Sequence, residues 1–195
     1  MSAAANHTGG EAGPADTVYL GVYRRAAIER VGGYDETMIV AEDWELNYRI
    51  RATGGLIWFT PELQVTYRPR TSLLALARQH FRYGRWRRVV TRRYPETVSP
   101  RYLAAPAVTA ANFAGCVLGV LGLAAIVGNG PVGLRYLLLG FAVPVGYLAG
   151  VTAVTAVLAR DLPASVRVRV PLVLATMHMC WGTGFLTSPR RLVKR

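Results

Sequence analysis

The second half of the 195-residue chain consists of long apolar stretches. A run without charged residues covers positions 102–134, and two further runs cover positions 136–159 and 170–189. A helix needs about 20 apolar residues to cross about 30 Å of hydrocarbon. The pattern predicts a transmembrane region over residues 102–195, with helices at about 103–127, 136–159 and 170–188.

The third apolar run is a weaker candidate for a span than the other two. It contains His178 and three residues that weaken helices, Pro171, Gly182 and Gly184. If it crosses the membrane, the basic tail at 190–195 ends on the outer side, against the tendency of arginine and lysine to stay in the cytoplasm. The sequence leaves two placements open, a span and a re-entrant or interfacial segment.

The first 70 residues show the short, mixed pattern of a small α/β domain. Residues 1–16 are small and polar, which predicts a flexible arm. Apolar and polar positions then alternate over 17–23, which is typical of a strand. Glycine pairs after residues 31 and 53 predict the ends of two helices. The expected elements of the domain at 17–70 are a strand at 17–23, helices at 24–31 and 42–53, and strands at 56–60 and 63–67.

A long basic helix is expected next, capped by Thr71 or Ser72 and ending near Tyr94. Its arginines gather in one stripe, and most of its apolar residues lie broadly opposite. This profile predicts an amphipathic helix on a membrane surface within residues 71–101, although an ordinary solvated arginine face has the same pattern. The stripe consists of Arg78, Arg82, Arg85, Arg88 and Arg92. Phe81 also falls on this side of the helix and breaks the pattern.

Composition and charge support a membrane partner. Hydrophobic residues make up 52% of the chain, and the formal net charge is +12. Much of this charge flanks the apolar runs, which favours anionic membrane lipid over nucleic acid as the partner. The arginines before residue 102 place the polar part on the cytoplasmic side of a multi-pass protein. The two cysteines lie inside apolar runs and predict neither a disulfide framework nor a metal site.

Two groups of residues have the character of a chemical site. Glu42 and Asp43 stand at the start of a predicted helix, where a carboxylate can act as a general base, although acids there also simply stabilise the helix. Gln79 and Arg82 lie one turn apart on the long helix, followed by Tyr83, with Trp86 at the border of the stripe. An arginine fork can hold a diphosphate, but the same residues fit a plain surface stripe.

Taken in order, these segments resemble the second half of a family 2 glycosyltransferase. The similarity is closest to membrane-anchored bacterial members of the succinoglycan-biosynthesis type, which build exopolysaccharide. Glu42-Asp43 matches the family's catalytic-base motif, which implies that Asp43 is the base. Gln79-His80-Phe81-Arg82-Tyr83 is similar to the family's Gln-x-x-Arg-Trp motif, with Tyr83 in place of tryptophan. The resemblance implies substrate-binding roles for Gln79, Arg82, Tyr83 and Trp86.

The resemblance also implies a fold, partners and a location. The expected fold is part of a GT-A-like α/β glycosyltransferase followed by two or three transmembrane helices, in the bacterial inner membrane. The expected partners are a nucleotide-sugar donor and a lipid-linked or glycan acceptor. The family's nucleotide-binding half and its Asp-x-Asp ligands for Mg²⁺ or Mn²⁺ are absent from this sequence. We therefore expect a truncated or split gene product, or a chain with a misassigned start, which is inactive alone or completed by a protein that supplies the donor half. The alternative is a non-catalytic membrane scaffold or partner subunit that binds anionic lipid through its basic helix.

Overall fold

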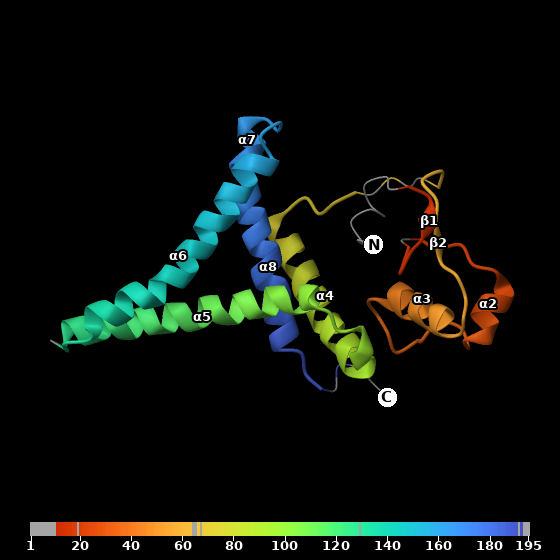
Figure 1. Ribbon diagram of the computed structural model, residues 1–195, viewed down its shortest axis with the longest axis horizontal. Coiled ribbons are helices and arrows are strands. Elements are labelled where there is room, and N and C mark those ends of the chain that lie inside the picture. Colours follow the sequence, from red (N-terminus) through yellow and green to blue (C-terminus); the bar gives the residue numbers. More distant parts are fainter. Residues whose placement is uncertain are drawn as a thin grey trace. The chain divides into compact units, whose positions relative to one another are not determined.

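The computed structural model describes residues 11–18, 20–63, 66, 68–128, 130–190 and 192. The chain forms two compact units, residues 1–69 with 189–195 and residues 70–188, and each is described here by itself. The described part is mostly helical, with two short strands (Figure 1).

The first unit is built around two helices, α2 (Arg25–Arg30) and α3 (Glu42–Ala52). Its two strands, β1 (Gly13–Pro14) and β2 (Trp58–Phe59), pair antiparallel, with Gly13 opposite Phe59. Its core is small because many of its large apolar residues, such as Val22, Ile39 and Leu56, are exposed. The core consists of Leu46, Ile50 and Ile57, with Val18, Tyr23 and Val31 packed against them.

Two expectations for the first unit need correction. Residues 17, 18 and 20–23 do not form a strand, because Leu20 has a positive φ of 55°, which extended backbone does not allow. The strand at Gly13–Pro14 lies instead in the segment expected to be a flexible arm. β2 is shorter than the expected strand at 56–60. Of the strand expected at 63–67, residues 64, 65 and 67 lie outside the described residues.

The second unit begins with the long helix α4 (Leu73–Arg93), and the side chain of Ser72 caps it by accepting a hydrogen bond from the Ala75 amide at 3.2 Å. A 3₁₀ turn, η1 (Pro95–Thr97), leads to α5 (Pro100–Val127) and α6 (Gly133–Leu158). The short α7 (Ala164–Arg167), which the sequence pattern did not predict, precedes α8 (Val170–Leu186). The expected helices at 71–94, 103–127 and 136–159 are therefore present, with ends shifted by a few residues.

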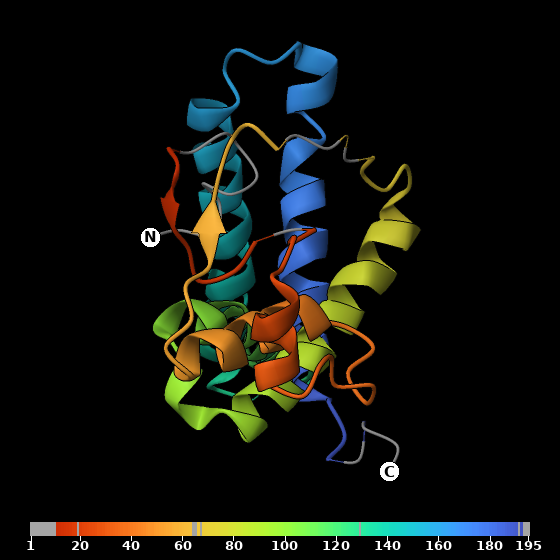
Figure 2. The same cartoon turned by 90° about the vertical axis from the view of Figure 1, so that its right-hand side faces the viewer.

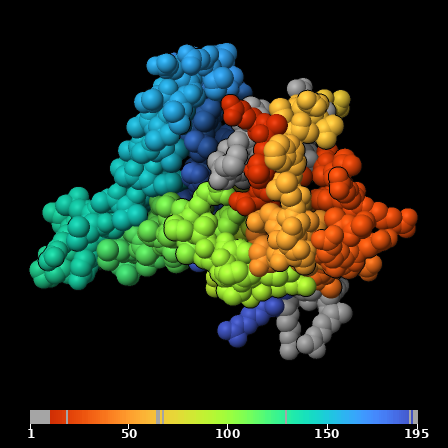
Figure 3. Space-filling model, turned by 45° about the vertical axis from the view of Figure 1, so that its right-hand side comes forward, coloured from red at the N-terminus to blue at the C-terminus, as the bar shows by residue number. Residues whose placement is uncertain are grey.

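Helices α5 and α6 form an antiparallel hairpin that packs through glycines. The Cα of Gly119 would lie 2.6 Å from a Cβ placed on Gly140, so only glycine allows the two backbones to approach this closely. Figures 1 and 3 show the helices meeting at the turn between them, with their side chains in contact there. Both helices are long and apolar enough to cross a membrane. In their most apolar stretches only 17% and 6% of residues are buried, which is unlike the core helix of a soluble protein.

Helices α4 and α8 run in the same direction and pack closely against each other (Figures 1 and 2). A Cβ on Gly84 of α4 would lie 2.9 Å from the Phe185 amide nitrogen, and one on Gly184 of α8 would lie 2.9 Å from the carbonyl carbon of Phe81. The arginine stripe of α4 is thus not simply a solvated or membrane-facing surface. Arg88 lies over the Phe185 ring at 4.8 Å, and Arg85 lies over Phe81 at 5.7 Å, which explains why Phe81 falls within the stripe.

Candidate active site

The start of α3 carries the candidate catalytic carboxylates. Ala41 precedes the helix in a left-handed conformation, with φ of 66°, so the chain turns sharply before Glu42. A non-glycine residue in this region stores local strain, which is a feature of functional loops. Glu42 is exposed, whereas Asp43 is half-buried. The turn therefore places two carboxylates with different surroundings at one helix end.

Asp43 is oriented by its own helix. Its Oδ1 accepts a hydrogen bond from the Trp44 amide at 2.6 Å. Within the described part of the chain, no arginine, lysine or histidine forms an ion pair with Asp43 or Glu42. The amino end of a helix favours negative charge, which suits a carboxylate that has no cationic partner. Asp43 is thus held in place by a backbone amide, and no described cation pairs with it.

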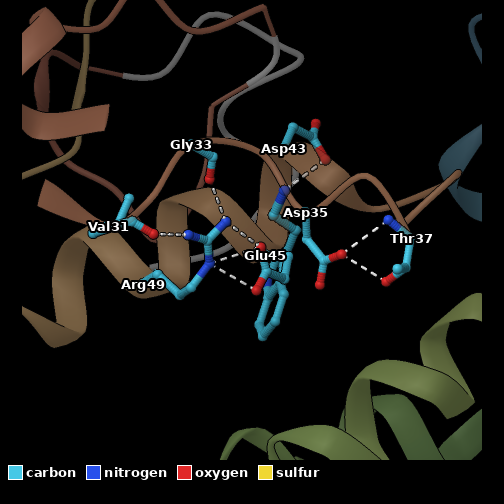
Figure 4. Close-up of polar contacts among 8 residues, drawn as sticks. Val31, Gly33, Asp35, Thr37, Asp43, Glu45 and Arg49 are labelled. Carbon is cyan, nitrogen blue, oxygen red and sulfur yellow. Dashed lines mark hydrogen bonds and ion pairs between the residues drawn. The ribbon is translucent and has the colours of Figure 1, made fainter. Parts of the chain in front are cut away.

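A buried ion pair holds the loop before α3 against the helix (Figure 4). Glu45 is fully buried, and both of its carboxylate oxygens accept hydrogen bonds from Arg49, at 2.7 to 2.9 Å. The same guanidinium donates to the carbonyl of Gly33 at 2.8 Å and to the carbonyl of Val31. One arginine fork therefore joins α3 to the turn that closes α2. We call Glu45, Arg49 and the two carbonyls the arginine clamp.

The loop between α2 and α3 has its own local order. Asp35 accepts hydrogen bonds from the amide of Thr37 at 2.9 Å and from its hydroxyl at 2.6 Å. Gly33 has a φ of 80°, and its amide donates to Ile28 at 3.0 Å, which ends α2. Backbone turns and the clamp together fix the path of the loop toward Asp43.

A hydrogen-bonded chain lies on the other side of α3. The Tyr23 hydroxyl donates to Oδ1 of the buried Asn47 at 2.8 Å, and Asn47 donates to the Thr17 hydroxyl at 2.8 Å. Burial of the phenol, with Tyr34 and Asp43 nearby, raises the pKa of Tyr23 to about 12. Tyr23 is therefore a neutral hydroxyl close to Asp43, and the sequence analysis did not single it out.

The second group of predicted site residues lies on α4. Gln79 donates to the Tyr83 hydroxyl at 2.6 Å and accepts from Arg70 at 3.3 Å. Arg82 is exposed beside them, so these three residues share an accessible part of the helix surface. Trp86 is only 5% exposed, and its predicted role in substrate binding remains a prediction. Asp43 belongs to the first unit and Arg82 to the second.

The divalent metal expected from the resemblance has no ligand set here. Among the residues that the structure describes, no group of three or more histidine, cysteine, aspartate or glutamate side chains could hold a metal ion. Mg²⁺ is usually held by one or two carboxylates together with waters and substrate phosphates. The metal expected from the resemblance therefore stays a prediction.

Comparison with known proteins connects this arrangement to a family. Residues 8–182 match Glycosyl transferase family 21. The chain is also 31% identical over 171 residues to the succinoglycan biosynthesis protein ExoA of Rhizobium meliloti (strain 1021), a match that covers 83% of this chain and 44% of that protein. The chain thus spans less than half the length of this relative. No solved structure matches it.

Proposed function

The chain belongs to glycosyl transferase family 21, and from this premise we propose a membrane-anchored sugar transferase. The resemblance to a glycosyltransferase of the exopolysaccharide type is confirmed by this match and by the similarity to ExoA. The assignment to family 2 is not confirmed, because the family whose model matches is family 21. The two apolar helices and the relative in polysaccharide biosynthesis fit a membrane-associated transferase.

We propose that the chain serves an inverting, membrane-anchored transferase, which moves a sugar from a nucleotide-sugar donor to a lipid-linked or polysaccharide acceptor. One observation carries the proposal. Asp43 is an oriented, half-buried carboxylate with no cationic partner among the described residues, at a helix start that the arginine clamp holds in place. Glu45 is already committed to Arg49, and Glu42 is exposed.

In the proposed reaction, Asp43 accepts the proton of an acceptor hydroxyl as the oxygen attacks the anomeric carbon. A bond forms from this oxygen to the anomeric carbon, while the bond from the carbon to the donor's diphosphate breaks on the opposite side, so the configuration inverts. The resemblance implies a separate substrate-binding role for Gln79, Arg82 and Tyr83 on α4, where the Arg82 guanidinium suits the negative charge of a diphosphate. We assign no step to a metal ion, because the described residues hold no ligand set for it.

We further propose that the first unit is the acceptor side of a GT-A-like fold, and that it lies in the cytoplasm. The start of α3 supports the fold, because the Glu-Asp pair stands at a helix end after an ordered loop, as a GT-A-like acceptor site requires. The arginines of α4 support the location, because they precede the first apolar helix.

The test is Asp43→Asn in the full product of the gene, assayed in its native membranes with radiolabelled nucleotide sugars. The amide keeps the shape of the side chain and removes its basicity. Sugar transfer should fall at least about 100-fold, the low end for a positioned general base. Glu36→Gln is the matched control, because Glu36 is an exposed acid in the same loop, and transfer should stay near the wild-type rate.

Near-normal transfer in Asp43→Asn would overturn the assignment of the base. Wild-type membranes without transfer to any acceptor would favour the non-catalytic scaffold instead.

A further inference from the structure

The buried amide of Asn47 has no role in the proposed transfer, although it lies on the same side of α3 as Asp43. The two residues are four positions apart on the helix, so their side chains are neighbours one turn from each other. Both lie away from the arginine clamp, and Figure 4 shows Asp43 pointing away from Glu45. Asn47 is fully buried, which is costly for an amide unless its hydrogen bonds are satisfied.

Asn47 joins two hydroxyl groups in a fixed direction. Its amide nitrogen donates to Oγ1 of Thr17 at 2.8 Å, so Oδ1 is the atom that faces Tyr23. The Tyr23 hydroxyl donates to this Oδ1 at 2.8 Å. A phenol has one proton, and the proton of Tyr23 is therefore committed to Asn47. The phenol oxygen keeps its lone pairs and can accept a hydrogen bond from a further partner.

The Tyr23 side chain reaches Asn47 because residue 21 is a glycine. A Cβ placed on Gly21 would lie 2.9 Å from Cε2 of the Tyr23 ring, so a side chain there would displace the phenol. The ring packs against the small core of the first unit and stays half-buried. Burial, Tyr34 and Asp43 together raise the pKa of Tyr23 to about 12, which agrees with a carboxylate close to a neutral phenol.

Asp43 and Tyr23 together offer two oxygens that accept hydrogen bonds. Oδ1 of Asp43 accepts from the Trp44 amide, and its second oxygen has no partner among the described residues. Each of the two free acceptors can bind the proton of one hydroxyl group. The pair therefore suits a molecule that presents two hydroxyls side by side, as neighbouring carbons of a sugar ring do. A simple alcohol would satisfy only one of the two oxygens.

We propose that Tyr23 binds the sugar acceptor by accepting a hydrogen bond from the hydroxyl next to the one that reacts. Asp43 takes the proton of the reacting hydroxyl, whose oxygen forms the bond to the anomeric carbon as the bond from that carbon to the diphosphate breaks. The neighbouring hydroxyl keeps its proton and donates it to Tyr23. Asn47 is a positioning residue for Tyr23, and the acceptor carries a vicinal diol. This assignment rests on the proposed function.

The test titrates the acceptor in detergent-solubilised membranes that contain the full product of the gene. The acceptor is supplied as an extract of lipids and polysaccharide from cells that lack this gene, with a radiolabelled nucleotide sugar as donor. Tyr23→Phe should raise the extract concentration for half-maximal transfer about three- to tenfold, the effect of one neutral hydrogen bond. The half-saturating donor concentration should stay within about twofold. A purely structural role would lower the maximal rate and leave both concentrations unchanged.

Two further variants separate the phenol from its surroundings. Gly21→Ala keeps the phenol but displaces it from Asn47, so it should raise the same extract concentration. Tyr34→Phe is the matched control, because it removes an exposed phenol hydroxyl that no described residue holds in a fixed direction. Its half-saturating extract concentration should stay within about twofold of wild type.

Periodate tests the diol, because it cleaves the carbon–carbon bond between neighbouring hydroxyls. Extract treated with periodate should no longer support transfer. Extract mixed with periodate that ethylene glycol has already consumed should support transfer as before. Undiminished transfer to the oxidised extract would overturn the proposal, since the acceptor would then need no vicinal diol.

An unchanged half-saturating extract concentration in Tyr23→Phe would also overturn the proposal, as would an equal rise in Tyr34→Phe. These outcomes differ from those of the Asp43 experiment. Loss of transfer in Asp43→Asn, with no shift in Tyr23→Phe, would keep the base and remove Tyr23 from the acceptor site. Near-normal transfer in Asp43→Asn would remove the base, and the role of Tyr23 with it.

Discussion

The buried carboxylate of Glu45 is the residue on which the loop before α3 most depends. An ion pair of this kind contributes little over an apolar pair of the same shape, but removal of one partner leaves a buried charge unpaired. Arg49→Met should therefore lower the free energy of unfolding of the first unit by about 3 to 5 kcal/mol. Hydrogen exchange of the α3 amides in the detergent-solubilised chain measures this.

The matched control for Arg49→Met is Arg25→Met. Arg25 and Glu29 form the same type of i,i+4 pair, at 2.9 Å, but their side chains are 91% and 64% exposed. Solvent screens such a pair, so its loss should leave the exchange rates of α3 nearly unchanged. Equal effects of the two substitutions would show that the arginine clamp has no special role.

Tyr23 gives the first unit a pH dependence at the alkaline end. Its pKa of about 12 lies above the ordinary value of about 10, so the folded state favours the protonated phenol. The resulting stability is fully present below pH 10 and is lost as pH rises through 12. Stability measured by hydrogen exchange or circular dichroism should fall over this window, and Tyr23→Phe should lessen the fall. An unchanged profile in Tyr23→Phe would contradict the assignment.

Some of the candidate site could be predicted from single residues, because its chemistry depends on local spacing. Asp43 at a helix start, and Gln79 one turn from Tyr83, follow from the sequence alone. The spacing of Glu45 and Arg49 was visible as an i,i+4 pair, but not the burial that makes it a clamp. The link from Tyr23 to Asn47 crosses 24 positions, and no local pattern predicts it.

Among the helices, the α5–α6 hairpin gives the sharpest test of packing. Gly140→Ala would place a methyl group against the backbone of Gly119 and should destabilise the hairpin by about 1 to 3 kcal/mol. Gly146→Ala and Gly150→Ala lie on the same helix with no atom within 4 Å, so they should have little effect. Unfolding in mixed micelles, followed by circular dichroism, compares the three. An equal change in all three variants would show that helix propensity, which favours alanine over glycine, and not close packing, decides the result.

The helices could be predicted more fully than the strands, of which only part of the one expected at 56–60 is present, for a physical reason. A helix of 21 residues such as α4 makes its hydrogen bonds internally and shows its period in the sequence. A strand needs a partner, and β2 has only Gly13 and Pro14 beside it in the described part of the chain. Alternation at 17–23 predicted a strand, but the left-handed Leu20 breaks the extended path. A tertiary contact also turned Arg88 toward the Phe185 ring of α8, which the helical period alone could not show.

For the molecule as a whole, the packing of α4 on α8 bears on how many times the chain crosses the membrane. α8 has 17 residues and a length of about 26 Å, shorter than the hydrocarbon core of about 30 Å. It is also absent from the described helices that are long and apolar enough to span. Since the arginine-bearing α4 lies against it, we propose that α8 stays at the interface and that the chain crosses twice.

Thiol labelling tests this topology. In a background with Cys116→Ser and Cys180→Ser, single cysteines are placed by Gly130→Cys, Asp161→Cys and Arg190→Cys. A reagent that does not cross the inner membrane should label only the first in intact cells whose outer membrane has been permeabilised. Labelling of the third as well would show that α8 crosses. Release of the chain from membranes by alkaline carbonate would contradict membrane insertion altogether.

The length of α5 has a consequence for the lipid around it. Its 28 residues measure about 42 Å, well beyond the thickness of an average hydrocarbon core. A helix that is too long for its bilayer tilts, and the tilt increases as the bilayer thins. Arg101 is anchored near one end of this helix, so its depth relative to the headgroups follows the tilt. Hydrophobic mismatch would then set the depth of Arg101, and a change in acyl-chain length would shift this charge relative to the headgroups without any change in the protein.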